Sequence, residues 1–469
     1  MSGPRSSPND PQALPDGLPL PRRYWAMAVI ILAIIMSVLD STIVNVALPT
    51  VARDFNASAA ASIWVVNAYQ LAILMLLLPL ASLGEIVGYK RVSQAGIAVF
   101  TLGSLACVLA PSLLTLTIAR VLQGLGAAGI MSVNVALVRF TYPQRFLGRA
   151  IGINAFVVAT AAAVGPTLAS AILAVGTWRW LFGINVPIGI ITFLIAVKAL
   201  PDSDREARAL NFAGTLLYAG AFGFALSGLQ ALSHHEATAF ALVQIALGAF
   251  LAALLIRHEL PRAAPLIPFD LLRRPIFALS ILTSVCSFTA QMSALVALPF
   301  EIQRLGHSAV ETGLFITPWP LALALAAPIA GRLADRHPAG ILGGLGLLVM
   351  SAGLVLLALY PATGGAPGLV WRMALCGLGF GFFQSPNNRT IMASAPRARS
   401  GAAGGMLSVG RLAGQTLGAA SVAILFRAFG AAASHLALYL AAALALTGAI
   451  ASLARLRHAL RAEGVTEHE

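Results

Sequence analysis

The chain of 469 residues has few charged side chains: Asp, Glu, Lys and Arg make up 10% of it, against about 25% in soluble domains. That leaves too little polar surface for a water-soluble protein. Hydrophobic residues reach 58%, and the mean hydropathy is +0.86. Apolar runs of about 18–25 residues recur from end to end, each long enough to cross the ~30 Å hydrocarbon core of a bilayer. The composition therefore predicts an all-α polytopic membrane protein.

Other absences narrow the function. The three cysteines, Cys107, Cys286 and Cys376, each lie inside a predicted span, which argues against a disulfide framework. No phosphate loop of the Walker type is present, so ATP-driven transport by this chain alone is unsupported. The histidines, including the pair His234 and His235, lack metal-ligand spacing, and no nucleophile has a plausible base. We therefore expect no enzyme activity, no metal site and no cofactor.

Apolar segments that can cross a bilayer number about fourteen. The first eight lie near residues 25–48, 62–82, 92–110, 113–137, 148–173, 180–200, 211–232 and 238–257. The last six lie near residues 275–298, 312–331, 341–361, 368–392, 402–426 and 434–455.

These segments suggest a division of the chain into two halves with an insertion between them. The expected parts are a disordered cytoplasmic tail (1–24), a six-helix bundle (25–200), two additional helices with linkers (201–274), a second six-helix bundle (275–455) and a cytoplasmic tail (456–469).

Basic residues concentrate in alternate loops, as the positive-inside rule requires. With the N-terminus inside, about 23 of the 30 Lys and Arg fall on the inner side and about five on the outer side. This bias places both termini in the cytoplasm and supports an even number of spans. It also accounts for the net charge of +13 without nucleic acid, for which no soluble domain is available. The expected partner of the basic loops is the lipid bilayer.

One acid stands deep in the first apolar run, in the segment LDSTIVNVALP at 39–49. Asp40 is the only acid that the sequence places firmly inside a span. A charge at the bilayer centre costs at least about 2.5 kcal/mol, so it usually faces a wet cavity or a partner. The alternative is a tolerated polar residue near a helix end. Arg120, in the fourth span, is the natural counter-charge, and its alternative role is to cap carbonyls of a neighbouring helix.

Polar residues in other spans are candidates for substrate contact, with helix packing as the alternative for each. The candidates are Asn45, Asn67, Gln70, Gln123, Gln291, Gln384, Asn387, Asn388, Arg411 and Gln415. Pro386 is expected to break the twelfth span between Gln384 and Asn387, as in the broken helices that line transporter cavities. Aromatic candidates for the same pocket, with interfacial or core packing as the alternative, are Trp64, Tyr69, Phe156 and Phe288.

A short motif occurs twice, as ASLGEIVGYKR at 81–91 and as GRLADRHPAG at 331–340. Each copy follows the second span of a half, which indicates two parallel six-helix repeats with a substrate site between them. Acid, glycine and basic residues at such a helix end can pair in one conformation and separate in another. The residues of this conformational latch are Gly84, Glu85, Gly88, Arg91, Gly331, Asp335 and Arg336. Arg91 or Arg145 is the expected partner of Glu85.

These motifs resemble those of the major facilitator superfamily and, within it, of the fourteen-helix drug:proton antiporter family. LDSTIVNVALP resembles the family's first-helix motif, LTIARVLQGLGAA at 116–128 its fourth-helix motif, and WRWLFGINVPIG at 178–189 the start of its sixth helix. The resemblance covers nearly the whole chain after residue 24. It implies the major facilitator fold, with two six-helix bundles and two extra central helices.

The chain departs from the family pattern in two places. The first loop motif has Glu85 where the family usually has Asp. The helix-packing antiporter motif of the fifth span keeps Gly165 and Pro166 but has Ala169 and Ser170 where a Gly-Gly pair is usual. Small residues at this pair still permit close helix approach.

The resemblance implies a proton-coupled exporter of amphipathic small molecules in the cell (inner or plasma) membrane, working by alternating access. Asp40 would carry the proton, and Arg120 would communicate with it. Two alternatives stay open: a dedicated metabolite exporter or proton symporter of the same fold, and a non-transporting membrane receptor or scaffold. Some members of the family work with periplasmic adaptors, but the sequence specifies neither an adaptor nor a substrate.

Overall fold

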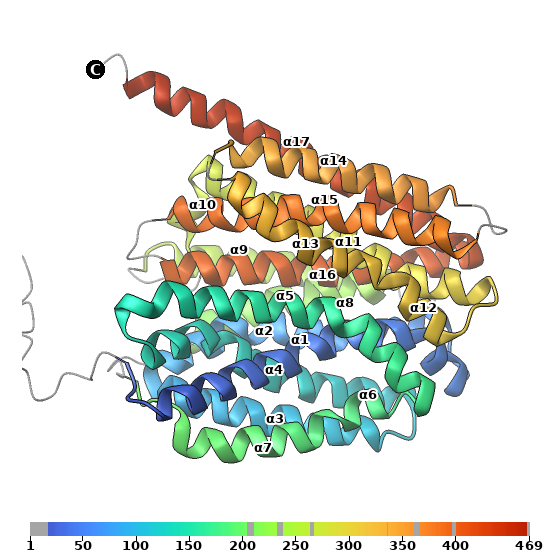
Figure 1. The fold of residues 1–469 in the computed structure, drawn as a ribbon, viewed down its shortest axis with the longest axis horizontal. Helices are drawn as coiled ribbons and strands as arrows, with labels where there is room; N and C mark the ends of the chain where they lie inside the picture. Colours follow the sequence, from blue (N-terminus) through green and yellow to red (C-terminus); the bar gives the residue numbers. More distant parts are fainter. Residues whose placement is uncertain are drawn as a thin grey trace, which may run out of the picture.

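The computed structural model describes residues 17–203, 211–231, 238–262, 267–334, 336–360, 365–395 and 400–466. Within these residues the chain forms α-helices and one short 3₁₀ turn, η2 (Gly430–Ala432), and no β-strand. The long helices lie side by side along one axis, and α1 begins at the same end of the molecule at which α17 ends (Figure 1). We use "far end" for the opposite end, at which α1 ends.

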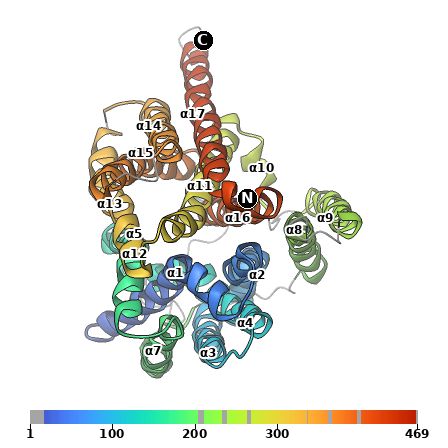
Figure 2. The same ribbon diagram turned by 90° about the vertical axis from the view of Figure 1, so that its right-hand side faces the viewer.

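The helices fall into two bundles and a pair beside them (Figure 2). The first bundle contains α1 (Arg22–Asp54), α2 (Ala59–Val87), α3 (Tyr89–Val108), α4 (Leu113–Thr141), α5 (Gln144–Val175), α6 (Trp180–Gly183) and α7 (Asn185–Ala199). The pair consists of α8 (Phe212–Ala231) and α9 (Thr238–Glu259). After the short α10 (Phe269–Leu272), the second bundle contains α11 (Pro275–Arg304), α12 (Ala309–Ile316), α13 (Pro318–Leu333), α14 (Ala339–Ala358), α15 (Ala366–Ala393), α16 (Ser400–Phe429) and α17 (Ala433–Thr466).

Twelve helical segments of the described residues are long and apolar enough to cross a membrane. The expected spans 148–173 and 368–392 coincide with α5 and α15, but α5 contributes only a shorter apolar stretch, Thr160–Val175, and α15 is not among the twelve. The expected count of fourteen is therefore not confirmed. The outer faces suit lipid, as on α9, where Leu242, Val243 and Phe250 are all more than half exposed.

The two bundles repeat one pattern, with corresponding residues 250 positions apart over their first three helical segments. The sequence VALP at 46–49 recurs at 296–299. Ser58 then caps α2 by accepting a hydrogen bond from a backbone N–H of its first turn, and Ser308 does the same for α12. In both bundles the proline lies inside the first helix and the serine begins the next one, so the same local signals start and end the same elements.

Small residues bring the helices of each bundle together at matching places. The sequence LQGLG at 122–126 of α4 corresponds to LCGLG at 375–379 of α15. A Cβ added to Gly126 would lie 2.7 Å from the carbonyl oxygen of Gly96 in α3, and one added to Gly379 would lie 2.5 Å from that of Gly346 in α14. Both halves therefore use glycine at the same contact to let two backbones approach closely.

The α8–α9 pair packs on the outside of both bundles through α8, which contacts α2 and α16. The hydroxyl of Tyr218 on α8 donates to the carbonyl oxygen of Leu74 on α2 at 3.0 Å. The assignment of 25–200, 201–274 and 275–455 to separate parts is compatible with these contacts and stays a prediction.

Three details differ from the sequence-based expectations. The twelfth span is not broken at Pro386, because α15 continues through it to Ala393; one lost backbone hydrogen bond costs less than unwinding a helix among apolar neighbours. Asp40 is not the only buried acid in the long helices, since Glu301 of α11 and Glu259 of α9 are also buried. Both lie past the ends expected from hydropathy, because the helices run on beyond the apolar stretch. Finally, α17 continues to Thr466, so most of the expected C-terminal tail is helical.

Candidate functional site

Asp40 lies in the middle of α1 and is 1% exposed. Its Oδ2 accepts a hydrogen bond from Arg120, with which it forms an ion pair between two fully buried side chains. Its Oδ1 accepts from Nε2 of Gln123 at 2.8 Å and from Nδ2 of Asn185 at 3.0 Å. Both carboxylate oxygens are thus bonded to donors from α4 and α7, in a place without water-exposed surface.

Arg120 connects this carboxylate to α2. Its Nε donates to the carbonyl oxygen of Val65 at 2.8 Å, and its Nη1 donates to Oε1 of Gln123 at 2.6 Å. The guanidinium carbon lies 4.0 Å from the centre of the Tyr69 ring, a cation–π contact. The hydroxyl of Tyr69 donates in turn to the carbonyl oxygen of Ser37 on α1 at 2.8 Å. Arg120 therefore pairs with the acid and also bonds a helix carbonyl, so both roles considered from the sequence are present.

Three of the predicted substrate-binding amides are buried with polar atoms that have no partner in the described structure. Asn45, Asn67 and Gln70 are at most 4% exposed. Neither polar atom of Asn67 is bonded, nor is the Oδ1 of Asn45 or the Oε1 of Gln70. Because buried polar atoms are almost always paired, such atoms are candidates for contact with a ligand.

Asn387 is engaged differently. Its Nδ2 donates to Oγ of Ser284 at 2.8 Å, and its Oδ1 accepts from Nη1 of Arg455 at 2.7 Å. Arg455 also donates to Oγ of Ser280 at 2.8 Å and to Oγ of Ser452 at 2.5 Å. These bonds join α11, α15 and α17, so in this conformation Asn387 serves helix packing, the alternative considered from the sequence.

The other predicted substrate-binding residues of the second bundle are half-buried. They are Gln291 on α11, Gln384 and Asn388 on α15, and Arg411 and Gln415 on α16. Each remains a prediction.

The predicted aromatic pocket residues lie in different parts of the structure. Tyr69 belongs to the Asp40 site, whereas Phe288 is buried with its ring centre 5.2 Å from that of Phe380, inside the core of the second bundle. Trp64 is half-buried. The side chain of Phe156 lies outside the described residues.

The first latch motif spans the turn between α2 and α3. Gly88 occupies the turn with φ +101°, a conformation that side chains with a Cβ rarely adopt. Gly84 is buried, Glu85 is half-buried and Arg91 is exposed. The side chain of Arg145, the other expected partner of Glu85, lies outside the described residues.

The second latch motif follows α13. Arg336 is exposed and Gly331 half-buried, whereas Asp335 lies outside the described residues. The latch function of both copies stays a prediction.

The fifth-span motif lies against both bundles. A Cβ added to Gly165 would collide with Thr42 of α1. A Cβ added to Gly313 of α12 would lie 2.7 Å from the carbonyl oxygen of Pro166. Next to this contact, the hydroxyls of Thr167 and Thr317 are 2.7 Å apart. The motif therefore packs α5 tightly between α1 and the second bundle, as small residues allow.

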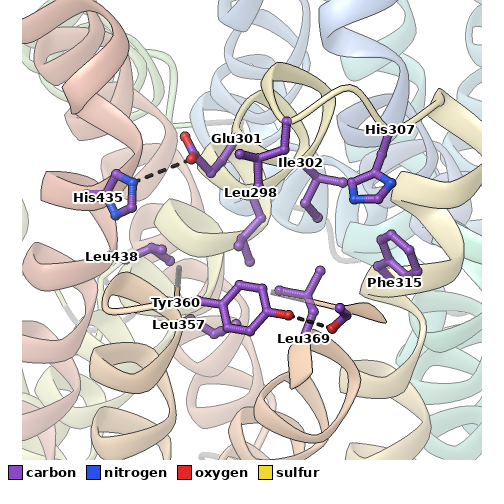
Figure 3. Close-up of a pocket in the computed structure, with 12 residues that line it drawn as sticks. Leu298, Glu301, Ile302, His307, Phe315, Leu357, Tyr360, Leu369, His435 and Leu438 are labelled. Atoms are coloured by element: carbon purple, nitrogen blue, oxygen red, sulfur yellow. Dashed lines mark hydrogen bonds and ion pairs between the residues drawn. The ribbon is translucent and has the colours of Figure 1, made fainter. Parts of the chain in front are cut away.

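A pocket lies at the far end of the second bundle, where α11 ends. Figure 3 shows the residues that line it. Its volume is about 510 Å³, open solvent included, and five leucines are among its twelve lining residues, including Leu298 of α11, Leu357 of α14 and Leu369 of α15. At its edge His435 lies 3.4 Å from Oε1 of Glu301, which also accepts from Arg304 at 2.6 Å. His307 and Phe315 face the pocket from the opposite side (Figure 3). None of the residues predicted from the sequence lines it.

Sequence reasoning did not single out Asn185, Ser104 or Arg455. Asn185 stands within the WRWLFGINVPIG motif, which was the available signal. Ser104 accepts from Nε2 of Gln123 at 2.8 Å but has no distinguishing context in the sequence. Arg455 falls at the end of a span, where a basic residue is ordinary. Among the described residues, no group of three or more His, Cys, Asp or Glu could hold a metal ion.

The family profile of the Major Facilitator Superfamily matches this chain over residues 30–419 and 281–466. The chain is 51% identical over 445 residues to the Uncharacterized transporter YebQ of Escherichia coli, covering 94% of this chain and 97% of that one. It is 33% identical to the Riboflavin transporter RibZ of Clostridioides difficile, covering 85% and 87% of the two chains. It is also 33% identical to the Multidrug resistance protein Stp of Mycobacterium tuberculosis, covering 82% and 73%.

Among solved structures, a bacterial homologue of the human lysosomal transporter Spinster, in an inward-facing and unoccupied conformation, matches with a TM-score of 0.68. The match covers 95% of this chain and 99% of that chain at 15% sequence identity, so it shows a shared fold.

Proposed function

Since the chain belongs to the major facilitator superfamily, and is therefore a multi-pass membrane transporter and not an enzyme, we propose that it exports amphipathic small molecules in exchange for protons by alternating access. Its bacterial relatives support a location in the inner membrane. The multidrug resistance protein among the relatives supports export of foreign compounds.

The observation that carries this proposal is the buried cluster of Asp40, Arg120, Gln123 and Asn185. An intramembrane carboxylate has to be compensated, and a carboxylate that can exchange a proton is the simplest titratable element for proton coupling. Asp40 meets this need because, among the described residues, its charged partner is a single Arg.

Protonation of Asp40 would change the bonding of α1 to α4 and α2. A carboxylic acid no longer attracts Arg120 as an ion does, so Arg120 would keep only its neutral partners, Val65 and Gln123, and its stacking on Tyr69. The carboxyl group would also have one fewer acceptor site for Gln123 and Asn185. Each proton taken up or released would therefore favour a different packing of α1 against α2 and α4, which is what alternating access requires.

The test is Asp40→Asn in proteoliposomes with an imposed pH gradient. The amide keeps the size of the carboxylate and can still accept from Asn185, but it carries no exchangeable charge. We expect gradient-driven export to fall to background. A thermal unfolding assay should show that the variant is still folded. Glu301→Gln, which neutralises another buried acid, is the control and should keep transport. If Asp40→Asn exported substrate at the rate of the wild type, Asp40 would not be the proton carrier.

A second candidate is a dedicated metabolite transporter of the same mechanism. The observation in its favour is the Riboflavin transporter among the relatives at 33% identity. Uptake and export assays with riboflavin under pH gradients of both signs separate the candidates. If the protein transports riboflavin but no structurally unrelated compound, the dedicated transporter replaces the multidrug exporter. If riboflavin moves in the same direction as the protons, the mechanism is symport and not export in exchange for protons.

A further inference from the structure

Arg411 is a further cation within the membrane-spanning region, besides Arg120 and Arg455. It lies in α16, eleven residues after the helix begins, and α16 contacts both α2 and α11. It is half-buried, and its Nε is buried without a hydrogen-bond partner in the described structure. It lies within electrostatic range of Tyr69, whose ring stacks on Arg120.

The charges at this junction do not balance. Asp40 is already paired with Arg120, and both of its oxygens are occupied. Arg411 takes part in none of the ion pairs found among the described residues. A guanidinium at this depth needs an anion or carbonyl groups to be tolerated, so an uncompensated one calls for a negatively charged ligand.

Unsatisfied amides occur at the same junction. Asn67 and Gln70 lie on α2, on either side of Tyr69 in sequence, and Nε2 of Gln70 is 4.0 Å from the sulfur of Met292 on α11. A Cβ on Gly418 of α16 would be 2.9 Å from Cβ of the same Met292. Gly418 follows Arg411 by seven residues, about two helical turns or ~10 Å along α16. The amides and Arg411 are therefore within the length of one drug-sized molecule.

We propose that the α2–α11–α16 junction binds the cargo and that the cargo is an amphipathic organic anion. Arg411 holds its carboxylate, sulfonate or phosphate group through the planar guanidinium. Asn67 and Gln70 hydrogen-bond polar ring substituents, and apolar neighbours such as Met292 contact the rest. This inference rests on the proposed transport function and adds the charge class of the substrate to it.

An anionic cargo also suits the energetics of export. Moving one negative charge outward across a membrane that is negative inside is electrically favourable. An inward-moving proton also transfers positive charge to the inside. The membrane potential and the pH gradient therefore both drive the exchange.

The experiment compares two dyes on the same tricyclic scaffold, anionic fluorescein and cationic rhodamine 123. Each is titrated by fluorescence anisotropy against the full chain in phosphatidylcholine nanodiscs at pH 7.5, with no gradient. The wild type should bind fluorescein at least about tenfold more tightly than rhodamine 123, the ratio expected of one charged hydrogen bond. Arg411→Gln should remove this preference, and Arg411→Lys, which keeps the charge, should retain part of it.

Arg427→Gln, near the far end of the same helix, is the matched control for a change in overall charge and should leave both affinities unchanged. Rhodamine 123 binding by Arg411→Gln shows that the variant is folded. The proposal is overturned if the wild type does not bind fluorescein, if it prefers rhodamine 123, or if Arg411→Gln keeps the anion preference. Asp40→Asn should still prefer fluorescein, so loss of proton-driven export and loss of anion preference can be told apart.

Discussion

At the level where the first bundle holds its charged cluster, the second bundle is apolar. With the repeats aligned, Asp40 of α1 corresponds to Ala290 of α11, and Arg120 of α4 corresponds to Met373 of α15. Tyr69, which stacks on Arg120, corresponds to Trp319. Ala290, Met373 and Trp319 are buried in the core of the second bundle at no more than 1% exposure. The same pattern of helices therefore surrounds a salt bridge in one half and hydrophobic side chains in the other.

This difference separates what builds the helical bundle from what acts in it. Both halves keep the glycine contacts, the proline in the first helix and the serine cap, so these features belong to the fold. Only the first half keeps the ion pair, so the bundle does not need it. A costly buried charge that the scaffold can do without is best explained by function.

The largest effect is expected from making the first half resemble the second. Arg120→Met leaves Asp40 buried without its counter-charge and should destabilise the protein by about 3–5 kcal/mol. Adding Asp40→Ala removes that charge too and should recover at least half of the loss, although transport stays absent. Thermal unfolding in detergent measures both variants. Equal destabilisation of the single and double variants would mean that the two charges do not depend on each other.

A smaller effect, equal in the two halves, is expected at the shared glycine contacts. Gly126→Ala and Gly379→Ala each place a methyl group against the backbone of the next helix and should cost about 1–3 kcal/mol. Gly404→Ala is the matched control, since a Cβ at Gly404 has no atom within 4 Å; it should be neutral or stabilise by up to about 1 kcal/mol. A loss confined to one half would show that the two contacts are not equivalent, contrary to the aligned repeats.

The smallest effect is expected at the ion pair of Glu301 and Arg304 in the second half. Glu301 pairs with Arg304, whose side chain is 49% exposed, so solvent screens their attraction. Glu301→Gln should change the free energy of unfolding by at most about 1 kcal/mol, measured in the same thermal assay. Arg304→Gln, which leaves the contact between Glu301 and His435 in place, should cost no more than Glu301→Gln. A loss as large as that of Arg120→Met would place the essential charges in both halves and remove the contrast between them.

The sequence predicted part of the site because burying a charged side chain in a membrane has a high free-energy cost. Asp40 and Arg120 stand out because charged residues are rare in apolar helices and must either form an ion pair or face a water-filled cavity. Asn185 does not stand out, because a neutral amide is tolerated with or without such a partner. Tyr69 was expected as an aromatic residue of the substrate pocket, whereas in the structure it stacks on Arg120. Asn387 was predicted to contact substrate, but in the structure its side chain donates to Ser280 and Ser284 and accepts from Arg455.

The sequence by itself determined that this chain crosses a membrane as helices, that it is built from two related halves, and that its first half contains a charge in need of compensation. Hydropathy, helix-capping residues and the free-energy cost of burying a charge are properties of single segments, so they can be predicted directly from the sequence. Only the tertiary structure decided which polar groups are paired and which, such as Asn67 and Arg411, are left with atoms unbonded. A hydrogen bond between helices depends on two segments far apart in sequence and on the faces they present to each other, and no single segment carries that information.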